Sequence, residues 1–249
     1  MSALRAKCPD CRTLTAVAIG PEYQCHACGR EFAAGLVRVP RAWGAGGDAM
    51  AAAAGLALPW PEAATIDEPT LAEQIDATAR ELPARPLVLG GCCCAHVGAV
   101  RELARRHGRI GLVWIDAHGD LNTPASSPSG NTWGMPLRML LDAGAVEARD
   151  VTLLGARNLD PPEAEFIQRM GIRDHLGELP ERVYVALDCD VLAPGSLDVF
   201  MPEPGGPTPA ELEHILASIP APAGAGLTGL VWSERNEAVL PRFAHALGF

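Results

Sequence analysis

The Asp-Ala-His-Gly-Asp segment at residues 116–120 constrains this chain more than any other feature. It follows directly after the apolar run 110–115. Because residues two apart on an extended segment face the same way, Asp116, His118 and Asp120 can converge on one point. Two carboxylates and one imidazole suit a divalent transition metal such as Mn²⁺. The segment therefore predicts a metal site at the end of a buried strand.

A second acidic segment supplies the other half of such a site. Asp188 and Asp190 flank Cys189 directly after the apolar run 183–187. In open α/β sheets the ligand lies at the carboxyl ends of the strands, so we expect both acidic segments at the same edge. Together they offer five ligands at two strand ends, which indicates a pair of metal ions bridged by carboxylates.

Alternating strand and helix patterns predict a three-layer α/β/α fold. Apolar runs predict strands over 36–39, 86–89, 110–115, 151–154, 183–187 and 227–232. Helix-length segments cover about 47–56, 70–82, 96–107, 134–143, 161–170, 208–218 and 237–246. Strands that are apolar on both faces and alternate with helices are typical of a parallel sheet covered on both sides. Pro- and Ala-rich stretches predict loops at 57–65 and 219–226.

The first cysteines form a separate pattern at the amino terminus. Cys8, Cys11, Cys25 and Cys28 are spaced as C-x₂-C-x₁₃-C-x₂-C. Two such knuckles predict one structural Zn²⁺ in tetrahedral thiolate coordination, as in a zinc ribbon, while free thiols and a redox pair are the alternatives. We therefore expect a zinc-ribbon-like module over residues 1–34 and a main domain over 35–249.

Composition excludes several classes of function. The net charge is −10 with no basic cluster, so we expect no nucleic-acid partner. The longest apolar stretches are strand-sized and predict no membrane span. No apolar signal region precedes the first cysteines, and we therefore expect a cytoplasmic protein with reduced thiols.

Several segments together resemble the ureohydrolase family, which includes arginase, agmatinase and formimidoylglutamase. The most specific is DAHGDLNTPASSPSGNTWGMPL at 116–137, and DCDVLAP at 188–194 resembles a second metal motif. GARNLDPPE at 155–163 and the carboxyl-terminal segment from GLVWSERNEAVLP onward are similar to family segments as well. The resemblance covers most of residues 36–249 and implies an arginase-like fold.

The resemblance implies a role for each metal ligand. Asp116 and Asp188 would bridge two divalent ions, Mn²⁺ foremost and Zn²⁺, Co²⁺ or Ni²⁺ otherwise. His118 and Asp190 would complete one ion, and Asp120 would ligate the other. A hydroxide bridging the ions would attack the guanidinium carbon, because two cations lower the pKa of the water between them.

The remaining roles concern the substrate. Asp120 would also help to protonate the leaving amine, and Glu234 would pair with the substrate guanidinium. The family resemblance places Asn122, Ser129 and Asn131 at an α-carboxylate, with Asp160 near the α-amino group and Glu163 behind it. This pattern favours an arginine-like amino acid, such as arginine or N-hydroxyarginine, over agmatine.

Two residues depart from the family pattern at the centre of the site. Cys93, in Gly-Gly-Cys-Cys-Cys, stands where the family has a metal-binding His, and a thiolate favours softer ions. His96 follows one helical turn later and would replace that ligand only if the backbone shifted. Trp133 stands where many arginases have a proton-shuttling His. Trp transfers no proton at neutral pH but can stack on a guanidinium.

The segment 171–183 is short for the family. A parallel crossover needs about a dozen residues or more, usually with a helix. Either a helix is missing or the neighbouring strand is reduced, and a second subunit or the zinc ribbon would cover the exposed face. We therefore expect a homo-oligomer.

Three functions remain open on the sequence. The first is hydrolysis of a guanidino or amidino C–N bond in an arginine-like amino acid. The second keeps the metal pair but acts on agmatine-like amines, formimidoylglutamate or guanidino acids. The third is a ureohydrolase-fold protein that has lost turnover and binds a metabolite or partner, which Cys93 and Trp133 favour and the retained acids oppose.

Overall fold

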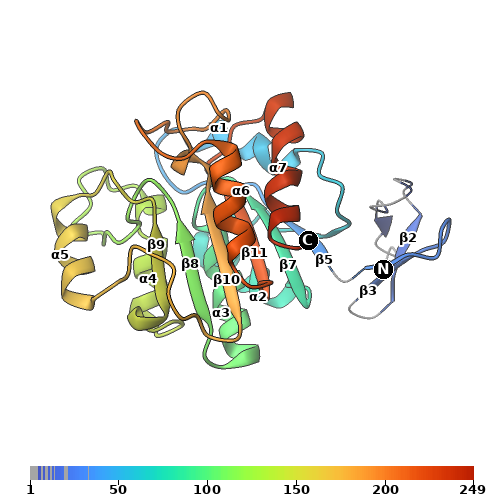
Figure 1. Cartoon of the computed structure of the whole chain (residues 1–249), viewed down its shortest axis with the longest axis horizontal. Helices are drawn as coiled ribbons and strands as arrows, with labels where there is room; N and C mark the ends of the chain where they lie inside the picture. The colour runs from blue at the N-terminus through green and yellow to red at the C-terminus, as the bar shows by residue number, and fades with distance from the viewer. Residues whose placement is uncertain are drawn as a thin grey trace.

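The computed structural model contains a small antiparallel sheet and a large parallel sheet (Figure 1). It describes residues 5, 6, 8, 11, 13, 15–19, 22–32 and 34–249. The small sheet has the order β1-β2-β3-β4, with strands β1 (Arg5–Ala6), β2 (Ala16–Ile19), β3 (Glu22–Cys25) and β4 (Glu31–Phe32). It lies beside one edge of the large sheet, where the Tyr23 hydroxyl donates to the carbonyl of Glu62 at 3.1 Å.

The large sheet has seven parallel strands in the order β6-β5-β7-β11-β10-β8-β9. Their bounds are β5 (Ala34–Val39), β6 (Glu62–Thr65), β7 (Arg85–Gly90), β8 (Gly111–Ile115), β9 (Val151–Leu154), β10 (Val183–Asp188) and β11 (Gly224–Thr228). Leu187 is in register with Ile115, and Asp188 with Thr228. The residues that follow β8, β10 and β11 are therefore close neighbours.

Helices cover both faces of the large sheet, which confirms the three-layer α/β/α fold (Figure 1). One face packs against the 3-10 turn η1 (Ala52–Gly55), α6 (Pro209–Ser218) and α7 (Glu234–Ala246). The other packs against α2 (Leu71–Glu81), α3 (Ala95–His107), α4 (Pro136–Asp142) and α5 (Pro161–Met170). The short pieces are α1 (Asp48–Ala51), η2 (Thr132–Gly134), η3 (Ala148–Asp150) and η4 (Cys189–Val191).

Strand β8 shows why the sequence folds in this way. Val113 and Ile115 belong to the core on one face, and Leu112 and Trp114 belong to the core on the other. All four are almost completely buried. Full burial of one such side chain stabilises the fold by about 1.5–3 kcal/mol, so a two-sided apolar strand is held firmly at the centre of the sheet.

Two predictions about the strands of this sheet were wrong. The last strand lies at Gly224–Thr228 and not at 227–232, so part of the predicted loop 219–226 is a strand. Its glycines hid it from the β pattern. They are needed because a Cβ on Gly226 would lie 2.6 Å from the His96 ring. The predicted loop 57–65 contains β6, an edge strand of weak β formers that pairs only with β5 and has an irregular register.

The segment 171–182 contains no helix, as its length predicts. The expected extra strand is reduced to one parallel bridge between Arg173 and Thr152 of β9. Leu176 and Leu179 of this segment pack against the core in place of a crossover helix. The small sheet lies at the opposite edge beside β6, so of the two predicted covers for this face the zinc ribbon is wrong and a second subunit stays a prediction.

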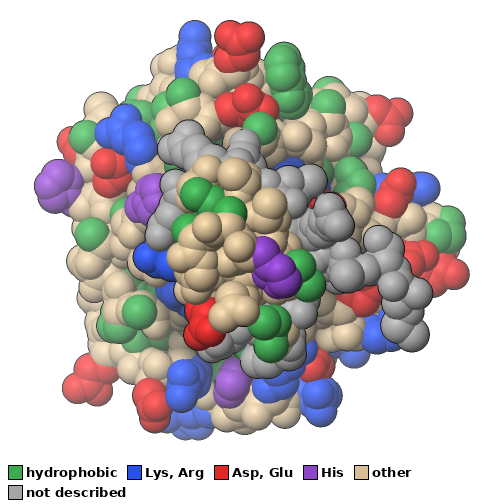
Figure 2. Space-filling model, turned by 90° about the vertical axis from the view of Figure 1, so that its right-hand side faces the viewer, with side chains coloured by type: hydrophobic (Ala, Val, Ile, Leu, Met, Phe, Trp, Pro, Cys, Tyr) green, Lys and Arg blue, Asp and Glu red, His purple; other side chains and the backbone are tan. Residues whose placement is uncertain are grey.

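The surface around the small sheet is mixed in charge, with acidic and basic side chains interspersed on that side of the molecule (Figure 2). None of the described helices combines the length and the apolar character needed to cross a membrane.

Candidate active site

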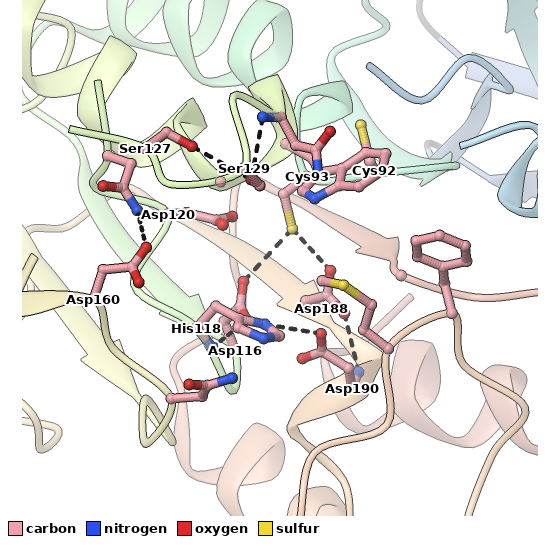
Figure 3. Close-up of a pocket in the computed structure, with 18 of the residues that line it drawn as sticks. Cys92, Cys93, Asp116, His118, Asp120, Ser127, Ser129, Asp160, Asp188 and Asp190 are labelled. Atoms are coloured by element: carbon pink, nitrogen blue, oxygen red, sulfur yellow. Dashed lines mark hydrogen bonds and ion pairs between the residues drawn. The ribbon is translucent and has the colours of Figure 1, made fainter. Parts of the chain in front are cut away.

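The carboxyl ends of five neighbouring strands border a pocket (Figure 3). Cys93 follows β7, Asp116 follows β8, and Asp160 lies beyond the end of β9. Asp188 ends β10, and Gly229 follows β11. All five residues line the pocket, because parallel strands present their carboxyl ends at one edge.

Two overlapping groups of ligand atoms lie inside this pocket. Cys93, Asp116 and Asp120 each offer one ligand atom within 4.8 Å of the others, and so do Asp116, His118 and Asp190. Asp116 belongs to both groups. Its Oδ1 accepts from the His118 backbone N–H at 2.7 Å and its Oδ2 from Trp114 Nε1 at 3.2 Å, which fixes the carboxylate between the two groups.

Asp188 also faces both groups. Its Oδ2 lies 3.0 Å from Cys93 Sγ, while its Oδ1 accepts from the Asp190 backbone N–H at 3.0 Å. Gly229 is required beside it, because a Cβ there would lie 1.9 Å from Asp188 Oδ1. The fold thus brings all six predicted main-site ligands together.

Burial and mutual repulsion raise the pKa of the carboxyl groups in this cluster. Burial is the largest cause, and it raises the pKa of Asp188 to about 7 and that of Asp190 to about 6, with neighbouring carboxylates adding to the shift. The same causes raise the pKa of Asp116, and they raise that of Asp120 well above its usual value. Bound cations would offset this repulsion, so the cluster is electrostatically suited to metal ions.

His118 shows the same demand for positive charge. Burial lowers its pKa, but hydrogen bonds and attraction to Asp116 and Asp190 outweigh burial and raise it to about 12. Its Nδ1 lies 3.1 Å from Asp190 Oδ2 and 3.4 Å from Asp116 Oδ1. The imidazole therefore already faces the two acids with which it would share a metal ion.

Asp120 has the strongest individual mark of a metal ligand. Its side chain is buried, and within the described part of the chain its Oδ2 has no hydrogen-bond partner. Its φ of 51° is also the only positive value among the described non-glycine residues. Strained backbone and an unpaired buried oxygen are costly, and both are expected where a ligand occupies the site.

Glu203 is a site residue that sequence reasoning missed. Its Oε1 lies 3.2 Å from His118 Nε2 and accepts from Asn158 Nδ2 at 2.9 Å. It therefore holds the nitrogen of His118 that faces away from the cluster. The residue stands 85 positions from His118 in an irregular loop, so neither period nor spacing pointed to it.

The predicted substrate-binding residues gather at another part of the pocket wall. Asn122 Nδ2 donates to Asp160 Oδ2 at 2.8 Å, and both residues line the pocket together with Ser129 and Asn131. Glu163 lies behind them, where its two oxygens accept from the backbone of Leu121 and of Asp160, both at 2.9 Å. Asn131 is held from the other side, because its Oδ1 accepts from the backbone N–H of Ala45 at 2.8 Å.

Trp133 forms an apolar wall of the same pocket. Its ring packs edge-to-face on Phe200, with the centroids 5.6 Å apart. A Cβ on Gly44 would come within 2.4 Å of the ring, so the glycine allows the 43–47 loop to press against it. Its backbone N–H donates to the carbonyl of Trp43 at 3.2 Å, which ties the two loops together.

The structure places Glu234 outside the pocket, and its pairing with a substrate guanidinium stays a prediction. Glu234 is exposed at the first residue of α7 and is not among the pocket-lining residues. Strand β11 ends at Thr228, and the Ser233 side chain caps α7, so Glu234 is fixed as the first residue of that helix. Outside the ligand cluster, the described acids that line the pocket are Asp160 and Glu163, and both oxygens of Glu163 already accept from backbone N–H groups.

The amino-terminal cysteines form their own cluster. Sulfur atoms of Cys8, Cys11, Cys25 and Cys28 lie within 4.8 Å of one another, with Cys8–Cys28 at 3.6 Å and Cys11–Cys25 at 3.5 Å. Zn–S bonds of about 2.3 Å in a tetrahedron place sulfurs about 3.8 Å apart. The four thiols therefore fit a single zinc ion.

Comparison with known proteins identifies the family. A sequence profile of the arginase family matches residues 47–174, which is just over half of the chain. The chain belongs to the arginase family. The matched segment holds the Asp116–Asp120 motif and the Asp160 region, and it ends before Asp188. An arginase of Staphylococcus aureus (strain COL) is 41% identical over 98 residues, which cover 35% of this chain and 32% of that protein.

Solved structures extend the likeness of fold beyond the matched segment. An arginase from Bacillus subtilis superposes with a TM-score of 0.73 at 21% identity, covering 86% of this chain and 97% of that one. A formimidoylglutamase from the same species gives 0.72 at 20% identity, covering 86% of each chain. The chain spans about a third of the length of the curated arginase described above. The fold is shared by an arginase and a formimidoylglutamase, so it is common to enzymes with different substrates.

Proposed function

We propose that this arginase-family protein is a metal-dependent hydrolase that cleaves a guanidino or amidino C–N bond in an arginine-like amino acid. The observation that carries the proposal is the pair of ligand groups sharing Asp116 inside one pocket, with Asp160 and neutral amides on its wall. Arginine and N-hydroxyarginine are the favoured substrates.

The ligand groups divide between two divalent ions. Cys93 and Asp120 would hold the first ion, and His118 and Asp190 the second, with Asp116 and Asp188 shared between them. The unpaired Asp120 Oδ2 and the repulsion among the carboxylates support this assignment. Oxygen and imidazole ligands suit Mn²⁺, whereas the Cys93 thiolate favours Zn²⁺, Co²⁺ or Ni²⁺ at the first position.

When bound, the two ions supply adjacent positive charges that make a water molecule nucleophilic near neutral pH. The protein side chains then position the substrate and move the proton. Asp120 would accept a proton from the attacking water through the carboxylate oxygen that does not hold the ion, and would pass that proton to the leaving nitrogen. Asp160 would hold the substrate ammonium group, while Asn122, Ser129 and Asn131 would donate to its carboxylate.

Trp133 would recognise the reacting end of the substrate. With Glu234 outside the pocket, a guanidinium has no carboxylate fork opposite the ligand cluster. The face of an indole ring attracts a planar cation, and Trp133 lines the pocket. This arrangement favours a flat, weakly basic group such as an N-hydroxyguanidine, whose leaving nitrogen needs less help from a proton shuttle.

The amino-terminal cysteines would bind one structural zinc ion. The sulfur distances and the C-x₂-C spacings support this site, which would order a small module over residues 1–34 beside a hydrolase domain over 35–249. The purified protein would then contain three metal ions per chain.

Counting metals in an Asp188→Ala variant tests the main site. We expect wild-type protein loaded with Mn²⁺ or Zn²⁺ to hold three ions per chain by elemental analysis, and Asp188→Ala to hold one, because the shared carboxylate is lost. Asp174→Ala removes a fully exposed acid and should keep all three. Full occupancy in Asp188→Ala would contradict the bridging role.

A urea-release screen distinguishes the substrates. Arginine, N-hydroxyarginine, agmatine and formimidoylglutamate are offered to protein loaded in turn with Mn²⁺, Co²⁺, Ni²⁺ and Zn²⁺, with ammonia or formamide measured where urea is not the product. If the protein turns over only agmatine or only formimidoylglutamate, that compound defines the substrate class and arginine-like amino acids are excluded.

A further candidate function is a binding protein without turnover. The position of Glu234 outside the pocket and the indole at Trp133 favour it. Full metal loading with no product from any substrate would establish it.

A further inference from the structure

A chain of buried polar side chains lies behind the metal-ligand cluster, on the side away from the pocket. It begins at Cys93, whose Sγ lies 3.2 Å from Thr228 Oγ1. Thr228 Oγ1 is 3.2 Å from His96 Nε2, and His96 Nδ1 is 3.1 Å from the Tyr184 hydroxyl. Of these four, only Cys93 lines the pocket, and none of the other three has a part in the proposed reaction.

Burial makes this chain energetically demanding. Thr228, His96 and Tyr184 are each fully buried, so every donor and acceptor needs a partner inside the protein. They come from three elements: Thr228 ends β11, His96 lies in the first turn of α3, and Tyr184 lies in β10. The fold makes room for them at Gly226, where a Cβ would lie 2.6 Å from His96 and 2.7 Å from the Tyr184 oxygen.

The donor and acceptor roles along this chain of side chains are fixed when Cys93 is a thiolate, because a thiolate can only accept. Burial lowers the pKa of His96 to about 3 and raises that of Tyr184 well above its usual value, so both groups are neutral. The Tyr184 hydroxyl then donates to His96 Nδ1, and His96 Nε2–H donates to Thr228 Oγ1. The remaining proton of Thr228 is left to donate to Cys93 Sγ, with the carbonyl of Leu187 a more distant acceptor at 3.4 Å.

We propose that Thr228, held by His96 and Tyr184, is a positioning residue that directs a hydroxyl donor at Cys93 Sγ and fixes the thiolate as a ligand of the first metal ion. The inference rests on the proposed metal pair. It gives His96 a supporting role in place of a ligating one, because its two nitrogens are taken up by Thr228 and Tyr184. Partners behind a ligand orient it, and their loss typically lowers metal affinity about 10–100-fold.

Cobalt binding to the full-length protein tests this proposal through a spectroscopic signal. Sulfur-to-Co²⁺ charge-transfer absorption reports thiolate ligation, and Cys93→Ser supplies the signal of the amino-terminal cysteines alone. The difference between wild type and Cys93→Ser therefore reports Cys93. We expect Thr228→Val, which keeps the shape and removes the hydroxyl, to shift or weaken that difference signal and to lower main-site affinity about 10–100-fold. Thr228→Ser should restore both.

The outcomes separate this inference from the proposed function. Wild-type affinity and an unchanged spectrum in Thr228→Val would overturn the positioning role alone. If wild type and Cys93→Ser have the same charge-transfer absorption, Cys93 does not ligate the ion. That result would overturn the proposed first metal site and this inference with it. If circular dichroism shows that Thr228→Val does not fold, Tyr184→Phe decides, because it removes one distant oxygen. We expect it to weaken cobalt binding less than about tenfold, and unchanged binding would overturn the proposal.

Discussion

His118 lies between two kinds of carboxylate. On one side Nδ1 faces Asp116 and Asp190, and on the other Nε2 faces Glu203 at 3.2 Å. A histidine that ligates a metal through one nitrogen commonly donates from the other to a carboxylate, which fixes the ring and its tautomer. Glu203 would therefore keep the His118 ring aimed at the second metal ion.

Glu203→Gln tests that role. The amide can still accept a hydrogen bond but carries no charge, so we expect affinity for the second main-site ion to fall about tenfold, and further in Glu203→Ala. Glu165→Gln on the exposed side of α5 is the matched control and should leave affinity unchanged. Competition against a chromophoric chelator measures each affinity. Equal affinities in Glu203→Ala and wild type would contradict the role.

At this scale the sequence predicted which acids and which histidine gather in the pocket, but not the side chains that support them. Asp116, His118 and Asp120 could be predicted because they follow a buried strand directly, at the edge of the sheet where ligands bind. Glu203 and Thr228 reach the site from separate segments, and only the folded chain brings them there. The position of Glu234 outside the pocket, at the first residue of α7, likewise became visible only in the folded chain.

Helix α3 shows how an element is held from its far end. Glu102 of α3 is nearly buried and accepts from Arg105 at 2.7 Å and from Arg106 at 2.7 Å. Arg106 in turn donates to the carbonyls of Pro83 and Leu82, just after α2. One carboxylate thus ties the last turns of α3 to the end of α2, and α3 begins beside Cys93.

Glu102→Gln should remove the pH-dependent part of the stability that this tie provides. The hydrogen bond to Arg105 is the main cause that lowers the pKa of Glu102 to about 2, with Arg106 adding to it. A carboxyl with a lowered folded-state pKa stabilises the fold above its ordinary pKa of 4.5, and that stability is lost as pH falls toward 2. We expect Glu102→Gln to lose about 1–3 kcal/mol at pH 7 and progressively less toward pH 2.

Urea unfolding at several pH values measures this difference, with Glu81→Gln, a more exposed acid at the end of α2, as the control. A loss of stability in Glu102→Gln that is the same at pH 7 and at pH 3 would contradict the assignment to the ionised carboxylate.

The predicted elements succeeded where burial and local pattern agree. Strands β7, β8, β9 and β10 and the capped helices lie close to their predicted bounds. Their apolar runs and capping residues such as Asp160 and Thr208 are local signals. Strands β6 and β11 carry no such signal. Strand β6 lies at the edge of the sheet. Strand β11 is rich in glycine and alanine, because His96 and Tyr184 occupy the space beside Gly226. Their positions come from neighbours that are distant in sequence.

The whole molecule is asymmetric about its sheet. At the β6 edge the four-cysteine module contacts the sheet through Tyr23, and at the β9 edge a loop with Leu176 and Leu179 replaces a crossover helix. The metal-ligand cluster lies between these edges, where β7, β11, β10 and β8 are buried on both sides. The acidic cluster is therefore placed where the sheet is buried on both faces, and its charges are costly there unless protons or cations neutralise them.

Metal-free protein should lose stability as pH rises from about 4 to about 7. Burial and mutual repulsion raise the pKa of Asp188 to about 7 and of Asp190 to about 6, so ionising these carboxyls disfavours the folded state. A raised carboxyl pKa means that the fold is undisturbed below the ordinary value of 3.8, loses stability progressively as pH rises toward the folded value of about 7, and loses no more above it. Divalent metal should reverse this loss at pH 8, by about 2.7 kcal/mol at a concentration 100 times Kd, and have little effect at pH 4.

Thermal unfolding with and without Zn²⁺ measures both effects. Asp188→Asn is the control, since it carries the same cysteine module, and it should be more stable than wild type in the metal-free state at pH 8 and gain less from metal. Equal stability of metal-free wild type at pH 4 and pH 8, together with equal metal stabilisation of both proteins, would show that the acidic cluster is not the main metal site.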